Sequence, residues 1–330
     1  MPDVITVGEM LIDFVPTVSG VGLAEAPAFK KAAGGAAANV AVGLSRLGER
    51  SGFMGKVGDD AFGHFLARTL RETRVDTAAL RFSAASRTTL AFVALRADGE
   101  REFVFYRQHT ADIMYRPEEV DQDYIRGARA LHFGSVSLVG EPARSATLLA
   151  VEVATAAGLL VSYDPNLRLN LWPSPAAALE GLRLGWPRAQ VIKVSEEELA
   201  FLSGLALEEL QEQAAAESAA RQLWHPKLRL LIVTRGRAGC RYVTNRFAGA
   251  LPGFAVPTVD TTGAGDGFVA GLLHRLLQDP AADQDEGTLR AACRYANAVG
   301  ALATTERGAI PALPTAARVA AFLQEQMERE

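Results

Sequence analysis

Residues 259–266, which read VDTTGAGD, give the clearest indication of the fold and of its site. In the sequence that follows, apolar residues recur at helical spacing, namely Phe268, Val269, Leu272, Leu273, Leu276 and Leu277. This pattern predicts a buried helix that begins at Gly263, Ala264 and Gly265. Because these residues carry almost no side chain, backbone N–H groups can approach an anion there, and the helix dipole favours negative charge. We therefore predict a phosphate-binding turn.

Asp266 lies in the first turn of that predicted helix. A carboxylate beside a bound phosphate is unfavourable unless it has a separate task, and accepting a proton from an alcohol that attacks phosphorus is such a task. The alternative is that Asp266 only caps the helix, since aspartate is favoured in a first turn. The local pattern leaves both interpretations open.

On both sides of this segment, short β-branched runs alternate with amphipathic stretches. Such alternation predicts an α/β fold of three layers, α/β/α, with a mostly parallel central sheet whose ligands bind beyond the carboxyl ends of the strands. The expected strands are 4–7, 52–56, 130–136, 159–163, 191–194 and 230–234, and helices are expected at 61–71, 143–157 and 208–223.

One part of the chain departs from this alternation. Residues 88–96 and 101–107 are strand-like and are joined by 97–100, whose Asp-Gly pair is typical of a hairpin. We expect this hairpin to pair with the strand-like residues 12–17 in a small β-sheet lid, built from about 12–32 and 86–112 of a single domain that spans 1–330. The alternative is a hairpin at an ordinary edge of the main sheet.

Composition excludes several classes of protein. The 330 residues contain 34 Lys+Arg and 38 Asp+Glu, a net charge of −4, which offers no general attraction to nucleic acid or to an anionic membrane. The two cysteines, Cys240 and Cys293, are too few for a disulfide framework. No apolar stretch approaches the ~20 residues that span a bilayer, and the first ten residues lack the basic region of a signal peptide. We expect a cytoplasmic protein.

A second glycine-rich turn precedes another predicted helix. Residues 34–39 read GGAAAN, and close backbone approach beside the Asn39 amide suits a polyol. The alternative is a simple glycine-rich helix start. The sequence contains no G-x-x-x-x-G-K-[ST] motif and no G-x-G-x-x-G after the first strand, which argues against P-loop and dinucleotide-binding proteins.

Taken in order, a series of motifs resembles the PfkB (ribokinase-like) carbohydrate kinase family from residue 4 to residue 314. Within the family, 90–107, 162–172 and 193–198 are most similar to fructokinases. The motifs are Gly8-Glu9 with Asp13, Gly34-Gly35 with Asn39, GKVG at 55–58 with Asp60, Asp164-Pro165-Asn166 with Arg168, Lys193-Val194-Ser195 with Glu198, Thr234-Arg235-Gly236 with Gly239, and 260–266.

This resemblance implies a ribokinase-like fold and transfer of the γ-phosphoryl group of ATP to a sugar primary hydroxyl. D-fructose, giving fructose 6-phosphate, is the expected substrate. A 2-keto-3-deoxygluconate kinase or a ribokinase of the same family is the near alternative, and a non-catalytic sugar-binding or regulatory protein is the distant one. The expected ligands are a small-molecule sugar and ATP with Mg²⁺ and K⁺, and the partner is a second copy that pairs through the lid.

The resemblance also implies a role for each matching residue. Asp266 would be the general base, and Gly263, Ala264 and Gly265 the anion hole. Residues implied in sugar binding are Asp13, Gly34, Gly35, Asn39, Arg107 and Arg168. Residues implied in ATP binding are Lys193, Glu198, Thr234, Gly236, Gly239 and Asn297, with Glu198 placing hydrated Mg²⁺. Asp260 and Thr262 match a monovalent-cation site.

Several of these residues also have a purely structural interpretation. Arg107 could be a solvated charge at the edge of the lid. Asp260 could close an Asx turn, and Asn297 could be an ordinary polar helix residue. Ser195 stands where the family motif has Asn, so a direct role of Ser195 in metal binding does not follow from the resemblance.

Overall fold

The computed structural model describes residues 1–18, 20–95 and 101–328. Within these residues, the main sheet has nine strands in the order β13-β12-β11-β10-β9-β8-β1-β4-β5. Neighbours from β11 to β5 run parallel, and only the β11-β12-β13 edge is antiparallel. The strands are β1 Val4–Val7, β4 Ser51–Gly58, β5 Leu80–Ser83, β8 Ala130–Gly134, β9 Leu160–Asp164, β10 Val191–Ser195, β11 Leu230–Thr234, β12 Cys240–Val243 and β13 Ala248–Leu251.

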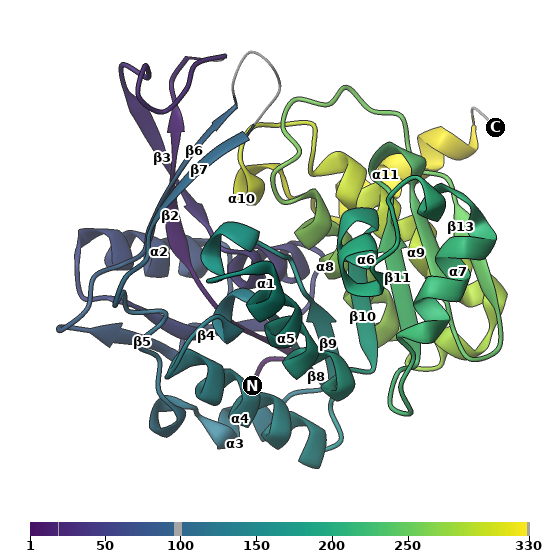
Figure 1. The fold of residues 1–330 in the computed structure, drawn as a ribbon, viewed down its shortest axis with the longest axis horizontal. Coiled ribbons are helices and arrows are strands. Elements are labelled where there is room, and N and C mark those ends of the chain that lie inside the picture. Colours follow the sequence, from purple (N-terminus) through teal and green to yellow (C-terminus); the bar gives the residue numbers. More distant parts are fainter. Residues whose placement is uncertain (19, 96–100, 329–330) are drawn as a thin grey trace.

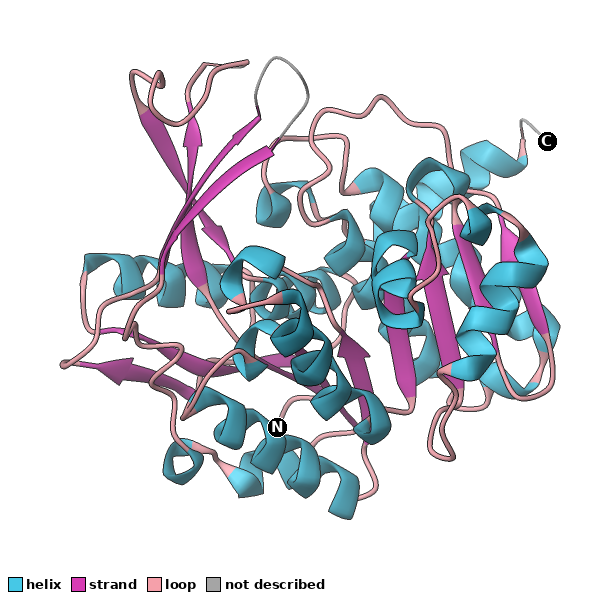
Figure 2. Ribbon diagram, in the orientation of Figure 1, coloured by secondary structure: helices cyan, strands magenta, loops and turns pink. Residues whose placement is uncertain are grey.

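Helices cover both faces of this sheet, which gives the predicted three layers (Figure 2). One core cluster joins a sheet face to α3–α7, and three further clusters join the other face to α1, α2 and α8–α11. The helices are α1 Ala36–Arg46, α2 Ala61–Glu72, α3 Gln122–Arg126, α4 Ala143–Ala156, α5 Pro175–Gly185, α6 Glu196–Ser203, α7 Gln213–Gln222, α8 Ala264–Gln278, α9 Glu286–Leu302, α10 Ala309–Ala312 and α11 Ala316–Met327.

Helix α8 follows the predicted apolar pattern and lies at the centre of its layer. All six residues of the predicted stripe are buried. On one side α8 packs against α1, where the Gly43 Cα position leaves room for Ala270, and on the other side it packs against α9. The amino end of α8 is therefore held by the two neighbouring helices of its layer.

A second, smaller sheet stands apart from the main one, at the upper left of Figure 1. It has the order β3-β2-β6-β7, with β2 Leu11–Pro16, β3 Phe29–Gly34, β6 Leu90–Leu95 and β7 Arg101–Tyr106. Strand β6 pairs with β7 in antiparallel fashion and with β2 in parallel fashion. The hairpin thus pairs with the 12–17 region as predicted, and the alternative of an ordinary edge of the main sheet is wrong. We call these four strands the lid sheet; the turn expected at 97–100 lies outside the described residues.

Most expected boundaries lie within two residues of the observed ones, and two of the expected elements end or break early. The strand expected at 130–136 ends at Gly134, and a 3₁₀ turn follows. The helix expected at 208–223 is a 3₁₀ turn followed by α7, because the carbonyl groups of Leu210 and Gln211 accept hydrogen bonds from Arg241 instead of continuing a helix.

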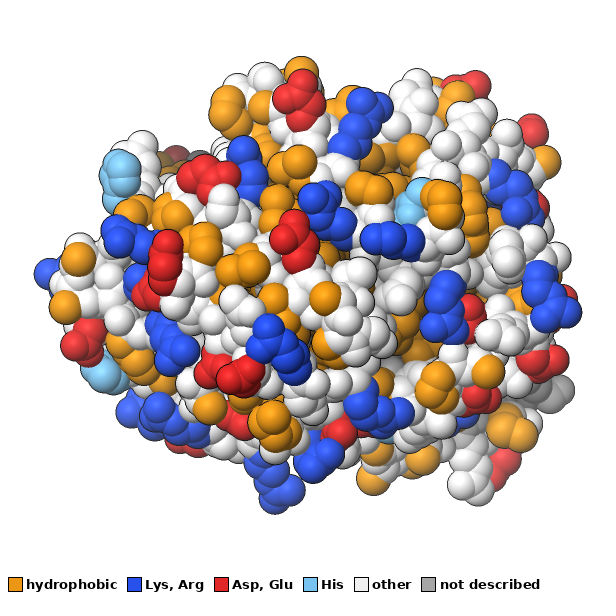
Figure 3. Space-filling view, turned by 90° about the horizontal axis from the view of Figure 1, so that it is seen from below, with side chains coloured by type: hydrophobic (Ala, Val, Ile, Leu, Met, Phe, Trp, Pro, Cys, Tyr) orange, Lys and Arg blue, Asp and Glu red, His pale blue; other side chains and the backbone are white. Residues whose placement is uncertain are grey.

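The surface repeats the charge balance of the composition. On the face in Figure 3, acidic and basic side chains are interspersed over the surface. Among the described residues, no helix is both long and apolar enough to cross a membrane. Cys240 and Cys293 are buried free thiols.

The turn before β12 supports a prediction about stability. Gly239 has φ +89°, and a Cβ atom there would lie 2.2 Å from the Leu251 carbonyl oxygen, whereas Gly236 has φ +52° with open space around its Cα. We expect Gly239→Ala to lower the free energy of unfolding by about 3 kcal/mol or more and Gly236→Ala by about 1 kcal/mol, because only the first adds a collision to the backbone strain. Urea unfolding of both variants measures this, and equal losses would contradict it.

Candidate active site

The amino end of α8 meets the carboxyl ends of β9 and β10. Gly263 precedes the helix in the left-handed region, with φ +82°. A Cβ atom on Gly265 would lie 3.2 Å from the Lys193 Nζ, so the lysine ammonium lies directly beside the first turn. The first N–H groups of a helix have no acceptor within the helix. Together with Lys193, they form a positively polarised corner of the site.

Lys193 is buried and ion-paired. Its Nζ lies 3.1 and 3.3 Å from the two carboxylate oxygens of Asp164, the last residue of β9. Burial opposes the charge on Lys193, but Asp164 and Glu198 outweigh it and raise the pKa of Lys193 above its ordinary value. The ammonium therefore stays charged at the strand ends.

Asp266 is buried in the first turn of α8 and contacts α1. Its Oδ2 accepts a 2.8 Å hydrogen bond from the Asn39 Nδ2. Burial raises the pKa of Asp266 to about 6, against the opposing effects of Asn39 and Lys193. A carboxylate with such a pKa is ionised at neutral pH and still accepts a proton readily, which suits a general base.

The second glycine-rich turn brings Asp13 to the same site. A Cβ atom on Gly34 would collide with the Asp13 carboxylate, and one on Gly35, which has φ +108°, would lie 2.5 Å from the Glu9 carbonyl oxygen. Position 35 therefore requires glycine, and a side chain on residue 34 would displace the Asp13 carboxylate. Burial raises the pKa of Asp13 to about 7; Arg168 lowers it, and Asp266 and other carboxylates raise it.

Glu9 holds this turn in place. Its buried Oε1 accepts a 2.8 Å hydrogen bond from the Ala36 N–H, at the start of α1. Burial raises the pKa of Glu9. Glu9 thus fixes the helix that carries Asn39. The sequence carries no local signal for this role of Glu9, because its bonding partner lies 27 positions away.

The two arginines expected in the site differ in environment. Arg168 is exposed and lies near enough to influence both Asp13 and Asp266 electrostatically. Arg107 is only 7% exposed. Its Nε lies 2.7 Å from Asp112 Oδ2, and its Nη2 donates to the Val136 carbonyl at 3.0 Å. The alternative of a solvated edge charge is wrong for Arg107, which is bonded at the base of the lid sheet.

The residues expected at the nucleotide lie around the carboxyl ends of β10, β11 and β13 and before the start of β12. Glu198 is buried and accepts from the Ser195 N–H at 2.8 Å and the Leu167 N–H at 2.7 Å. Thr234 Oγ1 donates to the Val194 carbonyl at 3.2 Å, and Asn297 Nδ2 donates to the Pro252 carbonyl at 3.1 Å. These hydrogen bonds position the local backbone. The expected contacts with ATP, including those of Gly236 and Gly239, stay predictions.

Asp260 fastens the loop before α8. Its Oδ1 accepts from the Thr262 N–H at 2.9 Å and the Thr262 hydroxyl at 2.7 Å, and its Oδ2 accepts from the Gly308 N–H at 2.9 Å. The Asx turn considered from sequence is therefore present. Within the described residues, no group of three or more His, Cys, Asp or Glu side chains could hold a metal ion. A cation here would depend largely on backbone carbonyls.

Taken together, the fold and site define a class of protein: an α/β enzyme with a buried carboxylate beside an anion-binding helix end, beneath a small β lid. A comparison with family models matches the description "pfkB family carbohydrate kinase" over residues 1–316. The chain belongs to this family of carbohydrate kinases and is a phosphotransferase.

Relatives and solved structures agree with this assignment. The chain is 52% identical to "Probable fructokinase-3" of Arabidopsis thaliana, with 99% of this chain and 93% of the relative covered. It is 52% identical to "Fructokinase-2" of Solanum lycopersicum, with 97% and 96% covered. The structure of fructokinase with bound ATP from Xylella fastidiosa has a TM-score of 0.88 at 36% identity, covering 99% of this chain and 100% of that one.

The buried charge of Asp266 leads to a prediction about stability. The folded-state pKa of about 6 lies above the ordinary value of 3.8, so the folded chain holds this proton more tightly and loses stability as pH rises from about 4 to about 6. At 1.36 kcal/mol per pKa unit this loss is about 3 kcal/mol. Asp266→Asn should remove it and raise the midpoint of urea unfolding at pH 8, with a smaller gain at pH 5.

Asp164→Asn is the matched control. It leaves Lys193 buried without its carboxylate, so it should lower the unfolding midpoint at both pH values. A loss of stability in Asp266→Asn at pH 8 would contradict the interpretation of Asp266 as a strained buried charge.

Proposed function

We propose that the chain transfers the γ-phosphoryl group of ATP to D-fructose, at the primary hydroxyl of carbon 6. The observation that carries this proposal is the buried Asp266 carboxylate at the amino end of α8, held by Asn39 and next to Lys193. The choice of fructose is supported by the fructokinase relatives and by a structure titled as fructokinase from Vibrio cholerae O395 "in fructose, ADP and calcium ion bound form", with a TM-score of 0.85 at 35% identity over 97% of this chain and 99% of that one.

In this proposal the sugar lies between the lid sheet and the glycine-rich turn of α1. Asp13 accepts hydrogen bonds from sugar hydroxyls, and Gly34 and Gly35 let the sugar approach the backbone. Arg168 lies at the exposed side of the same group of carboxylates. Closure of the lid sheet excludes water, which otherwise competes with the sugar as phosphoryl acceptor.

Proton transfer and charge stabilisation come from different groups. Asp266 accepts the proton of the attacking hydroxyl, while the hydroxyl oxygen forms its bond to the γ-phosphorus and the bond to the leaving ADP oxygen breaks. The N–H groups at Gly263, Ala264 and Gly265, with the Lys193 ammonium, stabilise the negative charge on the transferring group. This division explains why a carboxylate and an ammonium lie side by side.

The metal ions fit the donors available near the strand ends. Asp164 and Glu198 keep lone pairs that can accept from metal-bound water, so they would hold hydrated Mg²⁺, which neutralises ATP charge when bound. For K⁺, Asp260 and carbonyls of the 304–308 segment are the proposed ligands, and the Val259 and Asp260 N–H bonds to the Thr304 carbonyl bring that segment close. ATP itself would lie along Thr234, Gly236, Gly239 and Asn297.

Arg107 is not available to bind the carboxylate of 2-keto-3-deoxygluconate, because it is already paired with buried Asp112. The acidic-sugar alternative would therefore depend on exposed Arg168. We further propose a cytoplasmic location, which the two buried free thiols support. We also propose that two chains pair through the lid sheet, where Val15, Val104 and Tyr106 are exposed.

The direct test is an ADP-release assay with Mg-ATP and K⁺ over fructose, glucose, ribose and 2-keto-3-deoxygluconate. We expect the highest kcat/KM with fructose, and we expect Asp266→Ala to lower kcat by about 10³-fold or more because the general base is lost. A preference for another sugar would overturn the choice of fructose and keep the mechanism. No turnover by folded protein that binds ATP would overturn the kinase proposal.

A second test uses the pH dependence. Asp266 must be ionised to accept the proton, so kcat/KM should rise with pH through a midpoint near its pKa of about 6. Asn39→Ala removes a hydrogen bond that favours the ionised form, so the midpoint should move to higher pH. Asp13 has a pKa of about 7, so it titrates in the same pH range. The variant Asp13→Asn removes its contribution, and the midpoint near 6 should remain. An unchanged midpoint in Asn39→Ala would contradict the assignment of this limb to Asp266.

A further inference from the structure

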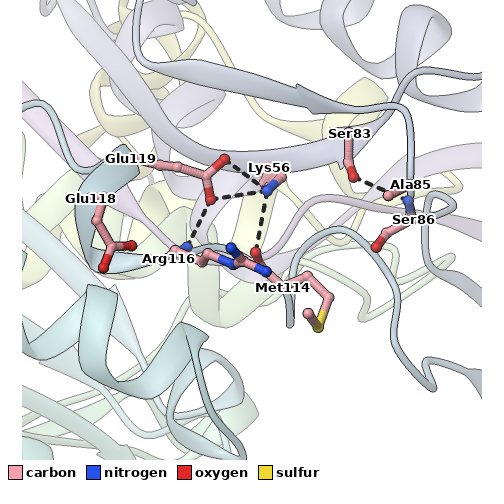
Figure 4. A pocket seen from close by; sticks show the side chains of 8 residues that line it. All are labelled: Lys56, Ser83, Ala85, Ser86, Met114, Arg116, Glu118 and Glu119. Atoms are coloured by element: carbon pink, nitrogen blue, oxygen red, sulfur yellow. Dashed lines mark hydrogen bonds and ion pairs between the residues drawn. The ribbon is translucent and has the colours of Figure 1, made fainter.

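A polar cavity of about 380 Å³ lies at the base of the lid sheet, outside the group of site residues described above. Figure 4 shows the side chains that line it. They come from the carboxyl ends of β4 and β5, from the loop that enters β6 and from the segment that follows β7, and they are Lys56, Ser83, Ala85, Ser86, Met114, Arg116, Glu118 and Glu119.

One wall of the cavity is a neutralised ion pair. The Lys56 Nζ lies 2.7 Å from a Glu119 carboxylate oxygen and also donates to the Met114 carbonyl at 3.2 Å. The other Glu119 oxygen accepts from the Arg116 N–H at 2.8 Å, which holds the 114–119 segment over β4. This wall therefore carries little net charge.

The remaining groups leave the Arg116 guanidinium, the Glu118 carboxylate and a serine hydroxyl available to a ligand. Among the described residues, the Arg116 guanidinium makes no ion pair, and it is exposed at the cavity. The Ser83 Oγ accepts from the Ser86 N–H at 3.0 Å, so its own proton is free to be donated to another group. A guanidinium fork with a hydroxyl donor suits a phosphate oxygen pair, and the neighbouring Glu118 and Glu119 carboxylates suit hydroxyl groups that donate.

We infer that this cavity is a second binding site, for a phosphorylated polyol, with its phosphate on Arg116 and its hydroxyls toward the glutamates. The volume of about 380 Å³ is sufficient for a phosphorylated sugar. Two kinds of ligand have this chemistry: the sugar phosphate that the proposed reaction forms, and other sugar phosphates.

The location gives the site a route to the lid sheet. Its walls belong to both connections of the β6-β7 hairpin, which are tied to each other by the Ala111 N–H bond to the Arg87 carbonyl at 2.9 Å. The entering connection is held to α2 by Asp60, whose carboxylate accepts from the Thr88 N–H at 2.9 Å and hydroxyl at 2.8 Å. A ligand that bridges both connections would shift the position of the lid sheet, so it would change the KM for sugar more than kcat. This regulatory consequence rests on the proposed function; the binding does not.

The test uses the methyl group of Met114, which lines the cavity. Protein labelled with ¹³C at methionine methyl groups is titrated with fructose 6-phosphate, glucose 6-phosphate and inorganic phosphate, with the Met114 signal assigned from Met114→Leu. We expect a saturable Met114 shift with both sugar phosphates, at about tenfold lower concentration than with inorganic phosphate. Met10, between Glu9 and β2, reports separately on the active site.

The matched variants are Arg116→Ala and Arg87→Ala, two exposed arginines of the lid connections, of which only Arg116 lines the cavity. Arg116→Ala should weaken the Met114 response at least tenfold, and Arg87→Ala should leave it unchanged. A response to fructose 6-phosphate alone would identify the reaction product as the source. The inference is overturned by an absent Met114 response, by a Met114 midpoint that always equals that of Met10, or by an equal response in Arg116→Ala. Because the signal requires no turnover, it separates failure of this inference from failure of the proposed function.

Discussion

The structure depends on the ion pair between Asp164 and Lys193, which lies where the carboxyl ends of β9 and β10 meet the amino end of α8. Asp164 and Lys193 are almost fully buried, and neither would be tolerated alone, because an unpaired buried charge costs several kcal/mol. Their pairing at 3.1 Å offsets most of that cost and fixes the Lys193 ammonium beside Gly265. A Cβ atom on residue 265 would lie 3.2 Å from that ammonium and would crowd it. Gly265 and the ion pair therefore act together, because they place a buried positive charge where an anion can bind at the amino end of α8.

The same packing explains how a carboxylate can be held beside that positive corner. Asp266 is bonded to α1, where the Asn39 amide satisfies one of its oxygens. Asn39 is in turn positioned by α1, whose first turn is bonded to Glu9 at the end of β1. The position of the proposed base thus depends on a chain of contacts from the sheet through α1 to α8. Movement of any of these residues would change the distance between Asn39 and Asp266, and with it the pKa of Asp266.

Much of this arrangement could be predicted from the sequence, and the reasons for the rest are physical. The helix after Gly263 was predictable because its apolar spacing is local, and the strands were predictable because buried parallel strands are continuous apolar runs. The Lys193–Asp164 pair carried no local signal, since the residues are 29 positions apart. Arg107 and Asp112 are close in sequence, yet alternation along a strand cannot show that a loop returns to bury the arginine. The break before α7 likewise depends on Arg241, which is distant in sequence.

The raised pKa values of Asp13 and Asp266 have a consequence for how the two substrates would affect one another. Sugar hydroxyls donate hydrogen bonds, so a bound sugar stabilises ionised Asp13 and lowers its pKa. A bound nucleotide brings negative phosphates, which raise the pKa of Asp266 and oppose the ionisation that proton acceptance requires. The Lys193 ammonium and the Asn39 hydrogen bond both oppose this effect, because each lowers the pKa of Asp266. Both groups therefore favour the ionised carboxylate, which is the form that a general base near a polyanion requires.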